Sequence, residues 1–152
     1  CPLASPTVID RVIGAFHEEG LDYVSNTLTP TYPDGLDVEV VRAPVLQWAA
    51  EHLTDPPERE HVTLGIYRRP DQFSVGNVEN AEDLSDLRWT VDTPDDLEFV
   101  RGVYSRLYEA DPEFEFDDVL RLVRSDASLS RTTMDGERNA ALNGLDTGAM
   151  NA

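Results

Sequence analysis

Asp92 lies where an expected strand meets an expected helix, and its carboxylate is the first candidate for chemistry. Residues 87–92 have the apolar pattern of a strand, whereas Thr93 and Pro94 are preferred at the N-cap and the first position of a helix. Open α/β sheets bind ligands at the carboxyl ends of their strands, and Mg²⁺ usually takes only one or two protein carboxylates. Asp92 is therefore a candidate metal ligand, although the local pattern alone favours a role confined to the turn.

Two further carboxylates, Asp37 and Glu39, lie in an expected strand over residues 36–42. Residues two apart in a strand point to the same face, so both carboxylates face the same way. Such a pair could accept hydrogen bonds from sugar hydroxyls or share a cation. The alternative, which the pattern alone favours, is a solvent-facing edge strand in a very acidic protein.

One histidine, His61, is a third candidate. A neutral imidazole there could donate a hydrogen bond to a substrate carboxylate or hydroxyl, and the alternative is a loop or helix-end histidine that bonds to the backbone. The single cysteine, Cys1, has no partner with which to form a zinc site. The sequence context also singles out no nucleophile of the Ser-His-Asp or Cys-His kind.

Helical and strand patterns alternate along the chain, which predicts an α/β fold with a three-layer α/β/α sandwich. Ser5 and Pro6 open a helix that Gly20 closes. Residues 54–60 are expected to form a proline-containing loop, and residues 62–67 either a strand or a short helix. The expected strands are 21–27, 36–42, 73–78 and 87–92, and the further expected helices are 43–53, 94–110 and one beginning at residue 116.

The charge of the chain argues against two classes of partner. The 152 residues carry a formal net charge of −18, and all 12 basic residues are arginines. This balance disfavours binding to nucleic acid and to an anionic membrane surface. Because the acidic residues are spread along the chain, we favour a solvated acidic surface suited to high salt over an acidic binding patch.

The remaining composition indicates one domain and a cytoplasmic protein. The length fits one domain. One cysteine excludes an internal disulfide. The sequence also contains no run of about 18 apolar residues, the length that a membrane span needs.

Several segments resemble, in the same order, motifs of the sugar-activating cytidylyltransferases. The resemblance is strongest to the SpsF-like branch, which is related to the acylneuraminate and 3-deoxy-manno-octulosonate cytidylyltransferases. It extends over about residues 1–129, and the combination is much more specific than any one segment. The segments are residues 1–3 (CPL), 32–40 (YPDGLDVEV), 60–63 (EHVT), 75–78 (VGNV) and 87–98 (LRWTVDTPDDLE).

The resemblance implies a nucleotide-diphospho-sugar transferase-like fold and an enzyme that activates a sugar, expected to be acidic, as a CMP-sugar for polysaccharide or glycoconjugate biosynthesis. The family's metal ligand in the last segment corresponds to Asp92, which implies Mg²⁺ as the cofactor. Asp37, Glu39 and His61 are expected to shape the sugar pocket. The implied partners are CTP, the sugar and a second copy of the chain, because the family is commonly dimeric.

Two features of the family do not occur in the chain. One is the nucleotide-binding loop of the form R-x-x-S-x-R-L-P-G-K, and the other is the metal-binding aspartate that normally precedes CPL. We therefore expect residues 1–129 to be the C-terminal part of a nucleotidyltransferase domain that is inactive alone, and residues 130–152 to be a flexible tail. The alternative is a non-catalytic sugar-binding or dimerisation module, either degenerate or completed by a separate chain.

Overall fold

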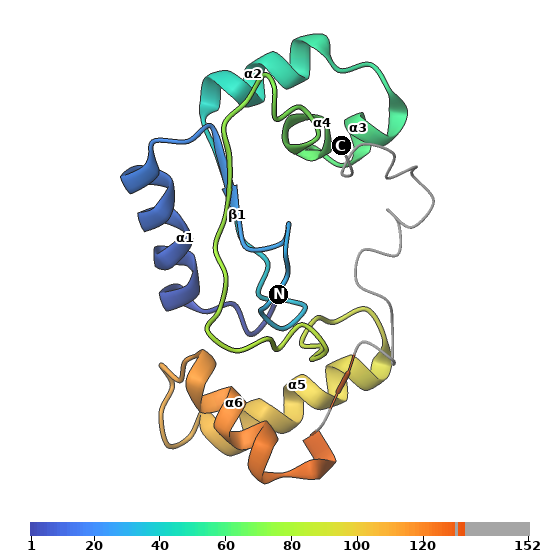
Figure 1. The fold of residues 1–152 in the computed structure, drawn as a ribbon. Helices are drawn as coiled ribbons and strands as arrows, with labels where there is room; N and C mark the ends of the chain where they lie inside the picture. The colour runs from blue at the N-terminus through green and yellow to red at the C-terminus, as the bar shows by residue number, and fades with distance from the viewer. Residues whose placement is uncertain (130, 133–152) are drawn as a thin grey trace.

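The computed structural model describes residues 1–129 and 131–132 as a mixed α/β structure. The elements in chain order are α1 (Pro6–Glu19), β1 (Tyr23–Ser25), β2 (Glu39–Val41), α2 (Ala43–His52), α3 (Pro56–Glu60), α4 (Leu64–Tyr67), β3 (Val75–Asn77), α5 (Pro94–Leu107), α6 (Phe116–Ser125) and the 3₁₀ helix η1 (Ala127–Leu129). Figure 1 shows α1 beside the central strands, α2 to α4 at one end of the molecule, and α5 and α6 at the other.

The sheet has three short strands in the order β2-β1-β3. β1 pairs with β2 in antiparallel fashion, which places Ser25 opposite Glu39, and with β3 in parallel fashion, which places Tyr23 opposite Val75. Helix α1 packs against β1 and β2. This mixed sheet with its covering helices confirms the α/β class predicted from the sequence.

Helix α1 forms where the sequence predicts it. Ser5 Oγ accepts a hydrogen bond from the backbone N–H of Val8, and Pro6 takes the first helical position. Gly20 ends the helix in the left-handed conformation, with a φ of 64°. The buried residues Val8 and Val12 then face the rest of the protein.

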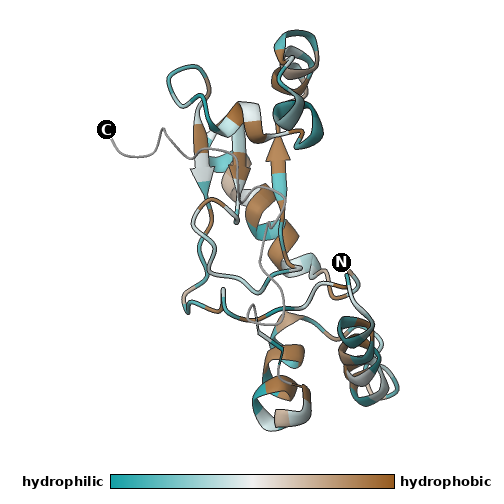
Figure 2. Ribbon diagram, turned by 90° about the vertical axis from the view of Figure 1, so that its right-hand side faces the viewer, coloured by the Kyte–Doolittle hydropathy of each residue, from teal (hydrophilic) through white to brown (hydrophobic). Residues whose placement is uncertain are grey.

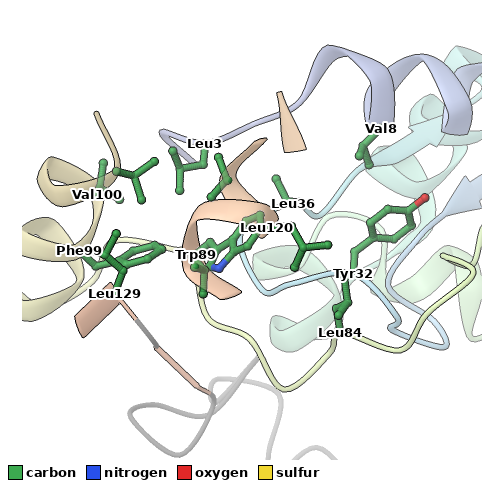
Figure 3. Close-up of a cluster of buried hydrophobic side chains, with 13 residues drawn as sticks. Leu3, Val8, Tyr32, Leu36, Leu84, Trp89, Phe99, Val100, Leu120 and Leu129 are labelled. Carbon is green, nitrogen blue, oxygen red and sulfur yellow. The ribbon is translucent and has the colours of Figure 1, made fainter. Parts of the chain in front are cut away.

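Two hydrophobic clusters hold the elements together. Figure 3 shows Trp89 beside Phe99 of α5 and Leu120 of α6. Figure 2 shows hydrophilic and apolar residues on the same helices, as expected for amphipathic helices that cover a core. The Trp89 cluster comprises Leu3, Val8, Tyr32, Leu36, Leu84, Trp89, Phe99, Val100, Val103, Val119, Leu120, Val123 and Leu129. The Tyr23 cluster comprises Tyr23, Val45, Ala49, Leu53, Ile66 and Phe73.

The strand predicted over residues 87–92 is wrong. The segment forms isolated bridges, such as that between Arg88 and Asp34, and no continuous ladder with the described residues. The reason lies in the partner segment, which turns at Gly35 with a φ of 105° immediately after the bridge. Pairing therefore stops after one residue, and Asp92 does not follow a strand of the sheet.

Other element boundaries also differ from the sequence prediction. Residues 54–60 contain the short helix α3 rather than only a loop. Proline is tolerated in the first helical turn, where the missing N–H has no helical acceptor to lose, and α3 begins with two prolines. Residues 62–67, which the sequence left open between strand and helix, contain α4. β2 begins at Glu39 rather than at residue 36.

The end of the chain is described in part. Arg131 and Thr132 are described, whereas the other residues of the predicted tail, 130 and 133–152, lie outside the described residues. Over the ranges 1–129 and 131–132, no helix is long and apolar enough to cross a lipid bilayer.

Candidate functional site

The side chain of Arg88 binds three carboxylates at once, and we call these four residues the Arg88 network. Nη1 lies 3.2 Å from Asp34 Oδ2, while Nη2 lies 2.7 Å from Asp92 Oδ2 and 3.2 Å from Asp96 Oδ2. The Arg88 side chain is only 5% exposed. Burying a guanidinium is costly unless its N–H groups are paired, and its planar fork suits several carboxylate oxygens.

Asp96 is the most deeply buried carboxylate of the network. Its Oδ2 accepts hydrogen bonds from the backbone N–H groups of Asp92 and Thr93, and the capping box with Thr93 begins α5. Its Oδ1 lies 3.0 Å from Arg131 Nη2. Burial opposes ionisation, but hydrogen bonds from Arg88 and from the start of α5 outweigh it and hold the pKa of Asp96 well below its usual value.

Asp92, the predicted metal ligand, is the exposed member of the network. Its side chain is 65% exposed and held through Oδ2 by Arg88, whereas Oδ1 accepts no hydrogen bond from the described residues. One open carboxylate oxygen fits Mg²⁺, which needs few protein ligands when substrate oxygens and water complete its shell. The described residues contain no group of three or more Asp, Glu, His or Cys that could hold a metal. Asp92 could therefore supply one ligand of a shared site.

The sequence analysis missed the other members of the Arg88 network. Asp34 and Asp96 lie in the family-like segments 32–40 and 87–98, but the sequence assigns a role only to other residues of those segments. A signal was present, because Arg88 is a charged residue between Leu87 and Trp89 in a segment with the pattern of a strand. Arginine is almost never fully buried unless it is paired, so a buried Arg88 requires acidic partners.

The three predicted substrate residues lie together. Asp37, Glu39 and His61 line one open pocket of about 230 Å³, which we call the Glu39 pocket. Asp92 is not among its lining residues. The structure thus brings together three of the four predicted site residues and places the fourth in the Arg88 network. The full lining is Thr27, Asp37, Glu39, His61, Val62, Thr63 and Tyr67.

The Glu39 pocket is positioned by the end of β1, the start of β2 and the start of α4. Before β2 begins, the Asn26 side chain holds the neighbouring segment: its Nδ2 donates to the carbonyl of Leu36 and its Oδ1 accepts from the N–H of Val38, both at 2.8 Å. The backbone on either side of Asp37 is therefore fixed. Residues before α4 are fixed by the hydrogen bond from Leu64 N–H to the His61 carbonyl, at 2.8 Å.

A buried tyrosine lies beneath this pocket. Tyr23 and Ser25 share one face of β1, and Ser25 is paired with Glu39. The Tyr23 hydroxyl is buried and makes no hydrogen bond of regular geometry with the described residues. Burial and the nearby charge of Glu39 raise the pKa of Tyr23 above its ordinary value. Its ring centroid lies 5.9 Å from that of Tyr67, which lines the pocket.

Gly35 connects the two regions. It lies between Asp34, in the Arg88 network, and Asp37, in the Glu39 pocket. A Cβ atom at Gly35 would lie 2.7 Å from the backbone of both Trp89 and Thr90, closer than real Cβ contacts. Glycine at this position therefore allows the backbone at residue 35 to lie directly against the backbone of Trp89 and Thr90.

Comparison with known proteins gives relatives that are longer than this chain. No protein-family model matches it. The chain is 29% identical over 135 residues to the spore coat polysaccharide biosynthesis protein SpsF of Bacillus subtilis, covering 86% of this chain and 55% of SpsF. It is 35% identical over 98 residues to an uncharacterized protein of Methanocaldococcus jannaschii, covering 63% of this chain and 39% of that protein. The chain thus spans about half the length of these relatives, or less.

A solved structure gives the fold. A cytidylyltransferase from Leptospira borgpetersenii superimposes with a TM-score of 0.79 and 24% sequence identity, covering 85% of this chain and 54% of that structure. The three-dimensional match extends over nearly the same share of the chain as the match to SpsF. The chain therefore has the fold of this cytidylyltransferase, a nucleotide-diphospho-sugar transferase fold. The similarity to SpsF agrees with the SpsF-like resemblance of the sequence motifs.

Proposed function

We propose that this chain is part of a nucleotidyltransferase that activates a sugar as a CMP-sugar for polysaccharide or glycoconjugate biosynthesis. The observation that carries the proposal is the meeting of Asp37, Glu39 and His61 in one pocket of a chain with a cytidylyltransferase fold. The similarity to SpsF, a polysaccharide biosynthesis protein, supports a sugar as the acceptor.

In the proposed reaction, an oxygen of a sugar hydroxyl bonds to the α-phosphorus of CTP. The hydroxyl proton is lost, the bond from the α-phosphorus to its bridging oxygen breaks, and pyrophosphate leaves. Catalysis of this kind depends chiefly on positioning and on stabilising negative charge. Mg²⁺ would neutralise charge on the phosphates, and Asp92 is the residue of this chain that would help to hold it.

The Glu39 pocket would bind and orient the sugar. The carboxylates of Asp37 and Glu39 can accept hydrogen bonds from sugar hydroxyls, and the imidazole of His61 can donate one. The resemblance to the family implies an acidic sugar. The described lining carries two carboxylates and no arginine, so a sugar carboxylate would need a cation from outside this lining.

A non-catalytic sugar-binding or dimerisation module is the second candidate. It is favoured by the separation of the two regions, because Asp92 does not line the Glu39 pocket. Sugar binding would then not depend on the metal ligand. A second copy of the chain as partner rests on the family resemblance.

The test combines binding and turnover. Sugar binding to the 152-residue chain can be followed by ligand-observed NMR, and pyrophosphate release can be followed with CTP, Mg²⁺ and a panel of sugars. Both assays are also applied to a form extended to include a nucleotide-binding loop. We expect binding by both forms and turnover by the extended form alone. Binding without turnover by either form would favour the module, and failure of both assays would refute a sugar-binding function.

A further inference from the structure

Arg88 has no role in the proposed reaction, yet its buried guanidinium contacts three carboxylates. Its Nε and Nη2 both lie 3.2–3.3 Å from the carboxylate of Asp96, and its Nη1 lies 3.2 Å from Asp34. The remaining contact of Nη2 is with Asp92 Oδ2, at 2.7 Å. Two buried carboxylates thus hold the guanidinium while it holds an exposed one.

The backbone around Arg88 is also fixed. The N–H of Asp34 donates to the carbonyl of Leu87 at 2.9 Å, and the N–H of Trp89 donates to the carbonyl of Asp34 at 2.7 Å. The N–H of Arg88 itself donates to the carbonyl of Arg131 at 3.1 Å. The direction of the guanidinium is therefore determined at both ends of the side chain, by the backbone and by the carboxylates.

Asp92 depends on this anchor. At 65% exposure its side chain is not packed in place. Apart from Arg88, the hydroxyl of Thr90 approaches the Asp92 carboxylate, and only at 3.5 Å. The short contact with Arg88 is therefore the main restraint on this carboxylate within the described residues. This contact uses Oδ2 of Asp92 and leaves its Oδ1 available to bind a cation.

We propose that Arg88 is a positioning residue that orients the Asp92 carboxylate for a divalent cation, with Asp34 as its distant anchor. This inference rests on the proposed role of Asp92 as a metal ligand. Metal-binding carboxylates are commonly oriented by hydrogen bonds from an outer layer of residues. The net charge of this region also favours a bound cation. Three carboxylates, those of Asp34, Asp92 and Asp96, outnumber the two guanidiniums of Arg88 and Arg131, which leaves the region negative.

The experiment uses Mn²⁺ as the probe and the ¹⁵N-labelled protein in the form extended to include a nucleotide-binding loop, because Asp92 supplies only one ligand of the shared site. Bound Mn²⁺ broadens nearby amide signals, so the signals of Asp92 and Thr93 report its affinity residue by residue. Arg88→Lys keeps the positive charge but loses the planar fork, so it separates geometry from charge. Loss of an outer-layer partner typically weakens metal binding by about 10–100-fold, and we expect Arg88→Lys to fall in that range.

Three further variants complete the test. Arg121→Lys is the matched control, since Arg121 pairs with Asp118 on the surface of α6, and it should bind Mn²⁺ as the wild type does. Asp34→Asn keeps both Arg88 and Asp92 but weakens the anchor, so a smaller loss of affinity is expected. Asp92→Asn should abolish the selective broadening. All spectra are recorded well below each variant's melting temperature.

The outcomes separate the two proposals. Selective broadening that persists in Asp92→Asn, or that never occurs in the wild type, refutes the metal role of Asp92 and the inference with it. Wild-type affinity in a folded Arg88→Lys refutes the inference alone and leaves the metal role standing. If Arg88→Lys does not fold, Asp34→Asn decides, and unchanged affinity in that variant overturns the positioning role.

Discussion

The Arg88 network and the Glu39 pocket use the same chemical group under opposite conditions. In the network, Asp34 and Asp96 are buried and paired with arginine. In the pocket, Asp37 and Glu39 are exposed on an open surface. Yet the two regions are only a few residues apart along the chain, because the segment from Asp34 to Glu39 contributes to both.

This difference in burial predicts that the Arg88 network stabilises the fold and that the Glu39 pocket is available for binding. A buried carboxylate that is fully paired fixes the backbone around it, and removing one partner leaves an uncompensated charge. An exposed carboxylate contributes little to stability and remains available to a ligand. We therefore expect substitutions in the Arg88 network to change the free energy of unfolding, and substitutions in the Glu39 pocket to change binding.

The largest effect is expected for Asp96→Ala. The substitution leaves the buried guanidinium of Arg88 without one of its partners and removes the Asp96 half of the capping box of α5. Breaking a buried ion pair in this way costs about 3–5 kcal/mol. Chemical denaturation of the wild type and the variant measures the difference in the free energy of unfolding.

Asp118→Ala is the control for this prediction. Asp118 occupies the same capping position in α6 and accepts a hydrogen bond from the N–H of Glu115, but its side chain is 36% exposed. Loss of such a cap costs typically about 1 kcal/mol. Equal losses in the two variants would contradict the special status of the Arg88 network.

The Asp96 contribution should also have a characteristic pH dependence. Because folding lowers the pKa of Asp96, its contribution to stability is complete above the ordinary value of 3.8 and is lost as the pH falls toward the lowered value. The difference in the free energy of unfolding between the wild type and Asp96→Ala should therefore become smaller below pH 3.8.

A smaller effect is expected for Gly35→Ala, which changes the residue that lies in the sequence between the Arg88 network and the Glu39 pocket. The substitution adds a Cβ atom at a φ of 105°, 2.7 Å from the backbone of Trp89 and Thr90. Strain of this kind costs about 1–3 kcal/mol. Gly14→Ala is the control, because nothing lies within 4 Å of its added Cβ and the residue is in the interior of α1. It should stabilise the protein by about 0.5–1 kcal/mol, and a loss in both variants would argue against a specific role for Gly35.

The sequence predicts some parts of this architecture well and others poorly, for physical reasons. The ends of α1 follow from local chemistry at Ser5, Pro6 and Gly20, so they are predicted closely. The residues 87–92 have the composition of a strand, but strand formation depends on a distant partner, and that partner turns away at Gly35. Local patterns cannot reveal this.

The candidate site was likewise predicted from the sequence only in part. Asp37, Glu39 and His61 were singled out from strand spacing and family-like segments, and they line one pocket. The Arg88 network escaped prediction because one of its ion pairs, Arg88 with Asp34, joins residues that are 54 positions apart in the sequence. Which acidic residue meets a buried arginine is decided by the fold, although the arginine itself can be noticed in the sequence.

Salt should have a modest effect that separates exposed from buried charges. At molar salt the Debye length falls to about 3 Å, so repulsion among exposed carboxylates is screened. With a net charge of −18, we expect molar KCl to stabilise the protein by about 1 kcal/mol, a rise of about 2–4 °C in melting temperature for a chain of this size. The loss caused by Asp96→Ala should change little with salt, because buried pairs are screened less. A melting temperature indifferent to KCl would contradict a surface suited to high salt.

The smallest effect on stability is expected for Glu39→Gln. Glu39 is exposed and pairs with no arginine among the described residues, so the free energy of unfolding should change by no more than about 0.5 kcal/mol. Sugar binding should nevertheless weaken, because hydrogen bonds to a charged acceptor are worth about 1.5–3 kcal/mol, which corresponds to a loss of roughly tenfold or more.

Glu109→Gln, at an exposed position just after α5 and outside the pocket lining, is the matched control and should alter neither quantity. Ligand-observed NMR measures the affinity and denaturation measures the stability. If Glu39→Gln binds sugar as tightly as Glu109→Gln does, the exposed carboxylate has no part in binding, and the contrast between the pocket and the Arg88 network reduces to a difference in burial.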